Sequence, residues 1–379
     1  MSVSAETYLD NAASAPMRPG SLEAMMPYFQ VHHGNPSGGH RVARRARQAV
    51  EESRDVVAAH LGCEPSEVIF TGGGTESDNL AVRGVMQARP GAALCSAIEH
   101  PAVIETVELF GGSSVAVDAE GKLDLDDLSR QLSDDTTLVS VMTANNEIGV
   151  IQDMSEVAET VRAGAPQATL HTDAVQAAPW CELGPVTQIV DLMSISAHKF
   201  GGPNGVGALM QRKGTALTAQ QSGGGQEQER RGGTQNVAGI VGMAEALDIT
   251  VRQRQEEGSR VRSLRDRLTN EILSGTSGVR CTVPQELGLP NICHLLMDEV
   301  ESEVLLVLLE REGVMASAAS SCASGAVGQS HVLAALGDRA GESRGAIRLS
   351  LGWATTADDI ERGAAGFLTA MKLALERLT

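Results

Sequence analysis

The sequence predicts an α/β protein with a mostly parallel sheet flanked by helices on both faces, followed by a smaller α+β domain. Strand-like and helix-like segments alternate through the first two thirds of the chain, a pattern typical of parallel strands joined by helices. After about residue 240 this alternation gives way to one long helical stretch and then to short strands and helices. With 379 residues, of which 42% are hydrophobic, the chain is long enough for a large domain and a smaller one.

The spacing of apolar residues predicts each element of the first domain. Arg41–Leu61, for example, places its apolar side chains on one helical stripe opposite a face rich in Arg and Glu. Runs of five to nine residues rich in Val, Ile and Leu predict buried strands. The expected helices are Arg41–Leu61, Thr75–Ala88, Ala102–Phe110, Leu123–Leu132 and Ser155–Ala163, and the expected strands are Glu67–Thr71, Ala92–Ala97, Ser113–Val117, Thr137–Ala144, Ala168–Thr172 and Ile189–Ala197.

The second part of the chain begins with a long helix, Val237–Leu273, which we expect to connect two domains. Strands are predicted at Asn291–Met297 and Gly345–Leu351, and helices at Glu301–Arg311 and Ala357–Leu375. We therefore expect a large domain over residues 15–255 and a small domain over residues 256–379 together with residues 1–14.

Composition limits the partners and the compartment. A net charge of −18 argues against nucleic acid or an anionic membrane as the main partner, so an anionic cofactor would need local donors. The six cysteines form no CxxC pair, and the sequence shows no signal segment and no apolar run approaching the roughly 20 residues of a membrane span. We expect a cytoplasmic protein with reduced thiols.

Lys199 follows a short apolar run and precedes a glycine-rich turn, in Ser194-Ile-Ser-Ala-His-Lys-Phe-Gly-Gly-Pro-Asn-Gly-Val-Gly207. An amine in apolar surroundings loses its charge and becomes a nucleophile for carbonyls, and nearby glycines let a phosphate approach the backbone. This suggests a lysine that holds pyridoxal phosphate. A surface lysine before an ordinary turn explains this stretch alone equally well.

Other polar motifs follow predicted strands, where parallel sheets bind their ligands. Thr71-Gly-Gly-Gly-Thr75 opens a helix, so its N–H groups can face an anion, although a plain turn with an N-cap also explains it. Asp173 could keep a pyridine nitrogen protonated, with Gln176 near the ring's phenolic oxygen, or Asp173 could cap a helix. His100 could stack on a ring and move protons, or be a satisfied loop residue.

Three further motifs carry polar or reactive side chains. Asn145-Asn146-Glu147 ends a strand and its amides can donate to a carboxylate or to the ring oxygen, or it is simply a turn. Arg348 interrupts an apolar strand and can bind a carboxylate through two parallel hydrogen bonds, or faces water at a sheet edge. Cys322 lies in Ala318-Ala-Ser-Ser-Cys-Ala-Ser-Gly, where we expect an exposed thiol that is either functional or incidental.

Together these motifs resemble the cysteine desulfurases of the NifS/IscS type, within the class V aminotransferases of pyridoxal phosphate fold type I. The resemblance runs nearly end to end. It covers Tyr8-Leu-Asp-Asn-Ala-Ala, Gly34-Asn-Pro-Ser, Gly74-Thr-Glu-Ser-Asp-Asn79, Glu99-His100, Asn145-Asn-Glu-Ile-Gly149, Asp173-Ala-Val-Gln176, Ser196-Ala-His-Lys199, Gly232-Gly-Thr234, Ser321-Cys322 and Ile347-Arg-Leu-Ser-Leu-Gly352.

This resemblance implies a seven-stranded sheet, a homodimer and pyridoxal 5′-phosphate as the cofactor. It also implies roles for single residues at the cofactor: Lys199 as the Schiff-base lysine and proton carrier, His100 as the ring-stacking acid/base, Asp173 at the ring nitrogen and Gln176 at the phenolic oxygen. The implied phosphate ligands are Gly74, Thr75, Ser196 and His198, with Thr234 reaching the partner subunit's phosphate. Arg348 and Asn146, with help from Asn35, are implied to bind the substrate carboxylate, and Cys322 is implied to be the thiol that takes the sulfur. No metal site is expected.

The implied reaction converts L-cysteine to L-alanine and passes sulfur, as a persulfide on Cys322, to an acceptor such as an iron–sulfur scaffold or a thiolation enzyme. The 14 residues between Cys322 and Gly337 resemble the long-loop group of the family. The chain departs from the family around Cys322 and in Ser222-Gly-Gly-Gly-Gln226 and Arg231-Gly-Gly-Thr234, which leaves the choice of partner open. A selenocysteine lyase, an aminotransferase of the same fold and a sulfur-relay protein with dispensable catalysis remain alternatives.

Overall fold

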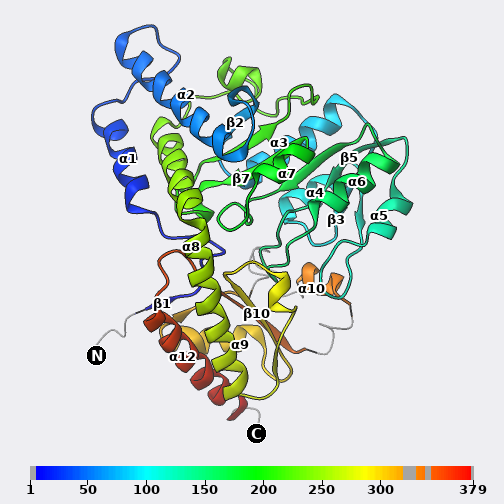
Figure 1. Ribbon diagram of the computed structural model, residues 1–379, viewed down its shortest axis with the longest axis vertical. Coiled ribbons are helices and arrows are strands. Elements are labelled where there is room, and N and C mark those ends of the chain that lie inside the picture. Colours follow the sequence, from blue (N-terminus) through cyan, green and yellow to red (C-terminus); the bar gives the residue numbers. More distant parts are fainter. Residues whose placement is uncertain (1–5, 319–329, 338–342, 377–379) are drawn as a thin grey trace.

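The computed structural model describes residues 6–318, 330–337 and 343–376. A long helix, α8 (Val237–Gly275), joins an upper body, built on the large sheet, to a lower body that holds both ends of the chain (Figure 1). This helix is the predicted connector. It has 39 residues, which makes it about 58 Å long.

The upper body is built on a seven-stranded sheet with the order β2-β8-β7-β6-β5-β3-β4. Its strand β8 is antiparallel to both neighbours, whereas the other neighbouring strands are parallel. The strands are β2 (Val68–Thr71), β3 (Ala92–Ser96), β4 (Ser113–Val115), β5 (Thr136–Ser140), β6 (Thr169–Asp173), β7 (Leu192–Ser196) and β8 (Gly207–Gln211). The mostly parallel sheet and the fold class predicted from the sequence are confirmed.

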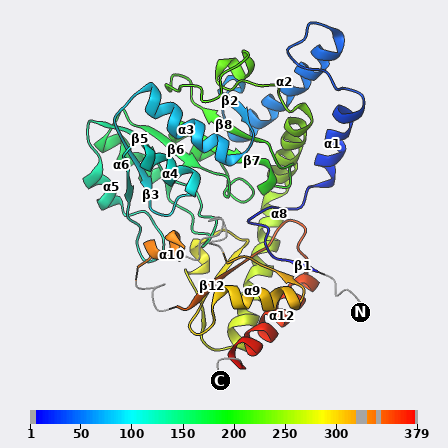
Figure 2. The same cartoon turned by 180° about the vertical axis from the view of Figure 1, so that it is seen from behind.

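Helices cover both faces of this sheet (Figures 1 and 2). One face packs against α3 (Gly74–Ala88) and α4 (Pro101–Leu109). The other packs against α2, α5, α6, α7 and the first half of α8. Their bounds are Arg41–Leu61, Leu125–Gln131, Met154–Gly164 and Gly184–Ile189 for α2, α5, α6 and α7. Because both faces are covered, β7 is buried at every position, which explains the continuous apolar run in its sequence.

The lower body has its own apolar core around an antiparallel sheet with the order β12-β10-β9. These strands are Gly345–Ser350, Ile292–Met297 and Val279–Cys281, and α9 (Ser302–Arg311) and α12 (Ala357–Glu376) pack with them. Near the N-terminus, β1 (Thr7–Tyr8) pairs in parallel with β11 (Val314–Met315), and Leu9 enters the same core. These contacts agree with a small domain that includes the N-terminal residues, although the domain boundaries stay predictions.

The second half of α8 also belongs to the lower core, through Val261, Leu268 and Ile272. Two further helices, α1 (Pro19–Gln30) and α10 (His331–Ala335), and four short 3₁₀ helices complete the described elements. The 3₁₀ helices are η1 (Pro65–Glu67), η2 (Ala197–Lys199), η3 (Gln226–Glu229) and η4 (Gln285–Leu287). Within the described ranges, no helix has both the length and the apolar character needed to cross a membrane.

Two predicted strands are wrong at their ends. The strand predicted from Ile189 begins only at Leu192, because residues 184–189 form α7 with a proline in its first turn. The strand predicted to reach Ala144 ends at Ser140, although Val141 and Thr143 still donate backbone hydrogen bonds to β6 residues His171 and Asp173.

Candidate active site

A cavity of about 400 Å³ lies where the carboxyl ends of the parallel strands face the lower body. Its walls come from segments that follow β2, β3, β5, β6 and β7, from the N-terminal segment and from β12. The predicted site residues that line it are Gly74, Thr75, His100, Asn146, Asp173, Gln176, His198, Lys199 and Arg348. The parallel topology thus gathers the motifs from Gly74 to Lys199, and the antiparallel sheet of the lower body adds Arg348 from β12.

Lys199 ends η2, immediately after β7, and is half-buried. Its Nζ donates hydrogen bonds to the carbonyl oxygens of Ala12 at 2.6 Å and Ala13 at 2.9 Å. The amine therefore sits inside the cavity against the N-terminal segment, which favours the functional interpretation of this lysine over a surface position.

Asp173 ends β6 and is buried, and its Oδ1 accepts a hydrogen bond from the Val175 N–H at 2.8 Å. The pKa of Asp173 is raised above its usual value, because burial outweighs the opposing effects of His100, the Val175 N–H and Lys199. Gln176 lies on the same wall, and its Oε1 is buried with no hydrogen-bond partner in the described part of the chain. A buried amide oxygen without a partner indicates a ligand atom at this position.

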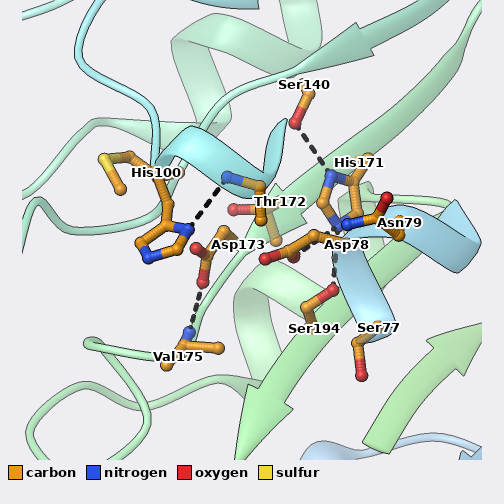
Figure 3. A network of polar contacts seen from close by, with 12 residues as sticks. Ser77, Asp78, Asn79, His100, Ser140, His171, Thr172, Asp173, Val175 and Ser194 are labelled. Atoms are coloured by element: carbon orange, nitrogen blue, oxygen red, sulfur yellow. Dashed lines mark hydrogen bonds and ion pairs between the residues drawn. The ribbon is translucent and has the colours of Figure 1, made fainter. Parts of the chain in front are cut away.

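His100 caps α4, because its Nδ1 accepts the Ala102 N–H at 3.1 Å (Figure 3). In the neutral ring the hydrogen therefore lies on Nε2. Burial lowers the pKa of His100, so the neutral form is favoured near pH 7. The ring lines the cavity beside Asp173, a position from which it can stack on an aromatic ligand.

The turn between β2 and α3 forms a cradle without side chains. Gly73 adopts a φ of 147°, and a Cβ added to Gly74 would lie 2.8 Å from Val175 Cγ2. The turn opens a helix of 15 residues, whose first N–H groups and dipole favour an anion. Ser196 Oγ bonds His198 Nδ1 at 2.9 Å beside this turn. Burial, followed by the Lys199 charge, lowers the pKa of His198 to about 4, so its ring is a neutral donor there.

Arg348 reaches the cavity from β12 and is buried. Its Nη1 donates to the Asn146 carbonyl oxygen at 2.8 Å, and its Nη2 donates to Asp10 Oδ1 at 2.7 Å. Its Nε is buried and has no partner among the described residues. The guanidinium is thus held in place by two of its five N–H groups, and Nε is among the donors that remain for a ligand. Asp10 and Asp78, which also line the cavity, were not singled out from the sequence.

Three predicted residues within the described ranges, Asn35, Ser196 and Thr234, do not line the cavity, and Ser196 is instead buried at the end of β7. Asn35 and Thr234 are exposed. Cys322 lies outside the described residues. The five cysteines within the described ranges carry free thiols, and burial raises the pKa of each. Such thiols are poor nucleophiles near neutral pH. No cluster of His, Cys, Asp and Glu able to hold a metal occurs in the described segments.

Comparison with known proteins identifies the family. Residues 7–362 match the family described as Aminotransferase class-V. The chain belongs to the class-V aminotransferases. Within this family it is 40% identical, over 363 residues, to a protein named cysteine desulfurase IscS from Dictyoglomus turgidum, covering 94% of this chain and 92% of that one.

A further relative and a solved structure are also similar to this chain. An IscS-like cysteine desulfurase from Mycobacterium tuberculosis is 40% identical over 370 residues, covering 93% of both chains. A solved structure titled NifS-like protein superimposes with a TM-score of 0.90 at 33% identity, covering 97% of this chain and 100% of that one. The resemblance stated from the motifs is therefore confirmed at the level of family and fold.

The cofactor of this family is pyridoxal phosphate, and the cavity fits it. Lys199 supplies an amine for the aldehyde, and the Asp173 carboxylate can face the ring nitrogen. The Gln176 side chain can make a further contact with the cofactor, because its Oε1 has no hydrogen-bond partner in the described part of the chain. Its amide N–H group is the donor that would face the phenolic oxygen of the ring. The Gly73–Gly74 turn suits the phosphate, because it opens α3 and leaves backbone N–H groups uncovered by side chains.

Proposed function

We propose that this protein is a cysteine desulfurase that converts L-cysteine to L-alanine and moves the sulfur to Cys322 and then to an acceptor. The observation that carries the proposal is the single cavity that contains the Lys199 amine, the Asp173 carboxylate and the Arg348 guanidinium. The relatives named cysteine desulfurase, at 40% identity over nearly the whole chain, support the choice of substrate.

The proposed reaction balances without an external oxidant or reductant. The substrate C–S bond breaks, a new S–S bond forms to the Cys322 sulfur, and the carbon that lost sulfur gains a proton. The products are alanine and a persulfide on Cys322. The bound cofactor supplies an electron sink for the substrate Cα, provided that its ring nitrogen stays protonated.

The chain's own residues bind the substrate and move its protons. Arg348 and the Asn146 amide bind the α-carboxylate, which the guanidinium can meet once its contact with Asp10 is shared or broken. Lys199 removes the Cα proton as an amine. His100, with its Nε2–H in the cavity, can donate a proton on the other side of the ring.

Two variants test this assignment. Lys199→Ala should lose the borohydride-reducible link to the cofactor and all alanine formation. Cys322→Ser should lose persulfide formation from cysteine while keeping the cofactor's absorbance band. Release of sulfide by Cys322→Ser at the parent rate would contradict the role of this thiol, and a reducible link in Lys199→Ala would contradict the role of the lysine.

The alternatives within the fold give different products. An aminotransferase would convert its cofactor to the amine form without releasing sulfide, and a selenocysteine lyase would prefer selenocysteine over cysteine. Measuring alanine and sulfide from both substrates separates the three enzymes. If the protein were a sulfur relay with dispensable catalysis, the Lys199→Ala variant would keep its cellular role.

We also propose that the enzyme works in the cytoplasm as a homodimer in which Thr234 reaches the partner subunit's phosphate site. The exposure of Thr234 outside the cavity of its own chain supports this. Sedimentation of the holoenzyme should give a dimer, and Thr234→Ala should weaken cofactor binding without changing the sedimentation coefficient. A monomer with normal cofactor affinity would contradict the proposal. The acceptor, such as an iron–sulfur scaffold or a thiolation enzyme, can be found by persulfide transfer to purified candidates.

A further inference from the structure

We propose that Asp78 is a proton-bearing carboxylic acid that positions Asp173 and leaves it as the anion that faces the cofactor's ring nitrogen. This makes Asp78 a positioning residue of the site. The inference rests on the cofactor site described above, and it goes beyond the proposed reaction because it concerns the charge state of the protein itself.

Asp78 lies in the second turn of α3 and is 1% exposed. Its side chain points toward the end of β6 and the middle of β7, where Asp173 and Ser194 are neighbours in register (Figure 3). Both aspartates line the same cavity. Two carboxyl groups therefore share one buried space, where ionising both would be costly.

The partners of the two carboxyl groups are unequal. Asp173 has the Val175 N–H at 2.8 Å and the nearby charge of Lys199, both of which favour its ionised form. Asp78 has one hydrogen-bond partner, the Ser194 hydroxyl. Its Oδ1 has no hydrogen-bond partner in the described part of the chain, and His171 Nε2 is 3.7 Å away, too far for one.

The charged and titratable groups that face Asp78 favour its protonated form. Burial and the charge of Asp173 both raise the pKa of Asp78, and Ser194 lowers it. Burial lowers the pKa of His171 to about 3, so this ring brings no positive charge. The titratable groups around Asp78 are Asp173 and His171 on β6, Glu99 and His100 after β3, and Lys199 after β7. Of these, Lys199 is the cation, and its charge lowers the pKa of Asp173.

A neutral Asp78 also gives a consistent hydrogen-bond chain. The Asp78 O–H donates to Ser194 Oγ, and the Ser194 O–H donates to His171 Nε2 at 3.1 Å. The His171 Nδ1–H then donates to Ser140 Oγ at 2.8 Å. The hydrogens of Asp78, Ser194 and His171 Nδ1 each have an acceptor in this row, and the row fixes Asp78 against the strand that carries Asp173. A second carboxylate charge would instead repel the phosphate and the substrate carboxylate.

The test compares Asp78→Asn, an isosteric mimic of the neutral acid, with Asp78→Leu and Asp173→Asn. The holoenzyme is stripped of its cofactor and reloaded with pyridoxal phosphate, and the dissociation constant is measured by absorbance. We expect Asp78→Asn to bind within about threefold of the parent, and the other two variants to bind at least about tenfold more weakly. An Asp78→Asn variant as weak as Asp173→Asn would overturn the proposal.

Two readouts report the proton directly. The infrared difference between the parent and Asp78→Asn near pH 7.5 should contain the carbonyl band of a protonated carboxyl group, and Asp78→Leu should give the same band. The parent's Tm should also fall relative to Asp78→Asn as the pH rises from about 5 to about 8, because the unfolded aspartate ionises near pH 4 while the native one keeps its proton.

A neutral Asp78 would be refuted if the carbonyl band were absent from both infrared difference spectra. It would also be refuted if the difference in Tm between the parent and Asp78→Asn did not change with pH. None of these measurements uses cysteine turnover, so their failure leaves the proposed reaction untouched, and an inactive enzyme would not decide the charge of Asp78.

Discussion

The buried ion pair between Arg54 and Glu227 offers a stability prediction that can be worked from the structure. Arg54 on α2 donates to the Glu227 carboxylate from Nη1 at 2.7 Å and Nη2 at 3.1 Å, and the two side chains are 5% and 1% exposed. Phe70 N and Gln235 Nε2 donate to the same carboxylate at 2.9 and 2.6 Å. The change Arg54→Met keeps an apolar stem and removes the cation.

Removing one partner of a buried pair typically costs about 3–5 kcal/mol, because the other charge stays buried without compensation. This carboxylate also anchors a strained segment, since Glu227, Gln228 and Glu229 have φ values of 48°, 56° and 67°. With about 2.1 cal/mol/K of unfolding entropy per residue, a chain of 379 residues should lose about 4–6 °C in Tm.

The assay is thermal unfolding of the holoenzyme near pH 7.5. Arg130→Met is the matched control, because its ion pair with Asp127 is 67% and 21% exposed and should contribute less than about 1 kcal/mol. Adding Glu227→Gln to Arg54→Met should recover at least half of the loss. A loss no larger than the control's, or no recovery in the double variant, would refute this reasoning.

The same pair gives a pH dependence whose sign follows from Glu227. Burial raises the pKa of Glu227, but the hydrogen bond and charge of Arg54 lower it by more. The native pKa therefore lies below the unfolded value. Its contribution to stability is therefore present above about pH 4.3 and is lost as the pH falls through the native pKa. The Tm gap between the parent and Arg54→Met should shrink on acidification; a gap that widens would contradict this sign.

Three further changes have defined outcomes. Arg348→Lys should lower kcat/KM for cysteine by about 10- to 100-fold, mainly by raising KM. A lysine cannot keep the contacts to Asn146 and Asp10 and also bind a carboxylate. An unchanged KM would argue against carboxylate binding by Arg348. Glu229→Gly should raise stability by about 0.5–1 kcal/mol in urea unfolding, since a residue at φ 67° is strained; a loss of stability would contradict this. Gly74→Ala should weaken cofactor affinity at least about tenfold because of the contact expected with Val175, whereas Gly39→Ala, with no described atom within 4 Å of the added Cβ, should not.

The sequence could predict the residues that follow strands, because a parallel sheet brings the ends of its strands together. Lys199, Asp173 and His100 each follow a local apolar run, and their meeting point required only the topology. Arg348 was recognisable because it interrupts an apolar strand.

The missed residues depend on contacts between distant segments. Asp78 reads as an ordinary polar residue on a helix, and its burial comes from packing against β6 and β7. Asp10 meets Arg348 across 338 residues of sequence. The roles proposed for Asn35 and Thr234 would require contacts beyond the cavity of one chain, which no local pattern contains.

The most direct test of the central claim is a single turnover of the holoenzyme with L-cysteine in the absence of an acceptor. Alanine is quantified, and the protein is digested and mapped by mass spectrometry without reductant. We predict one alanine per sulfur atom added, with that sulfur on the peptide that contains Cys322. Alanine without protein-bound sulfur, or sulfur on another cysteine in place of Cys322, would contradict the account.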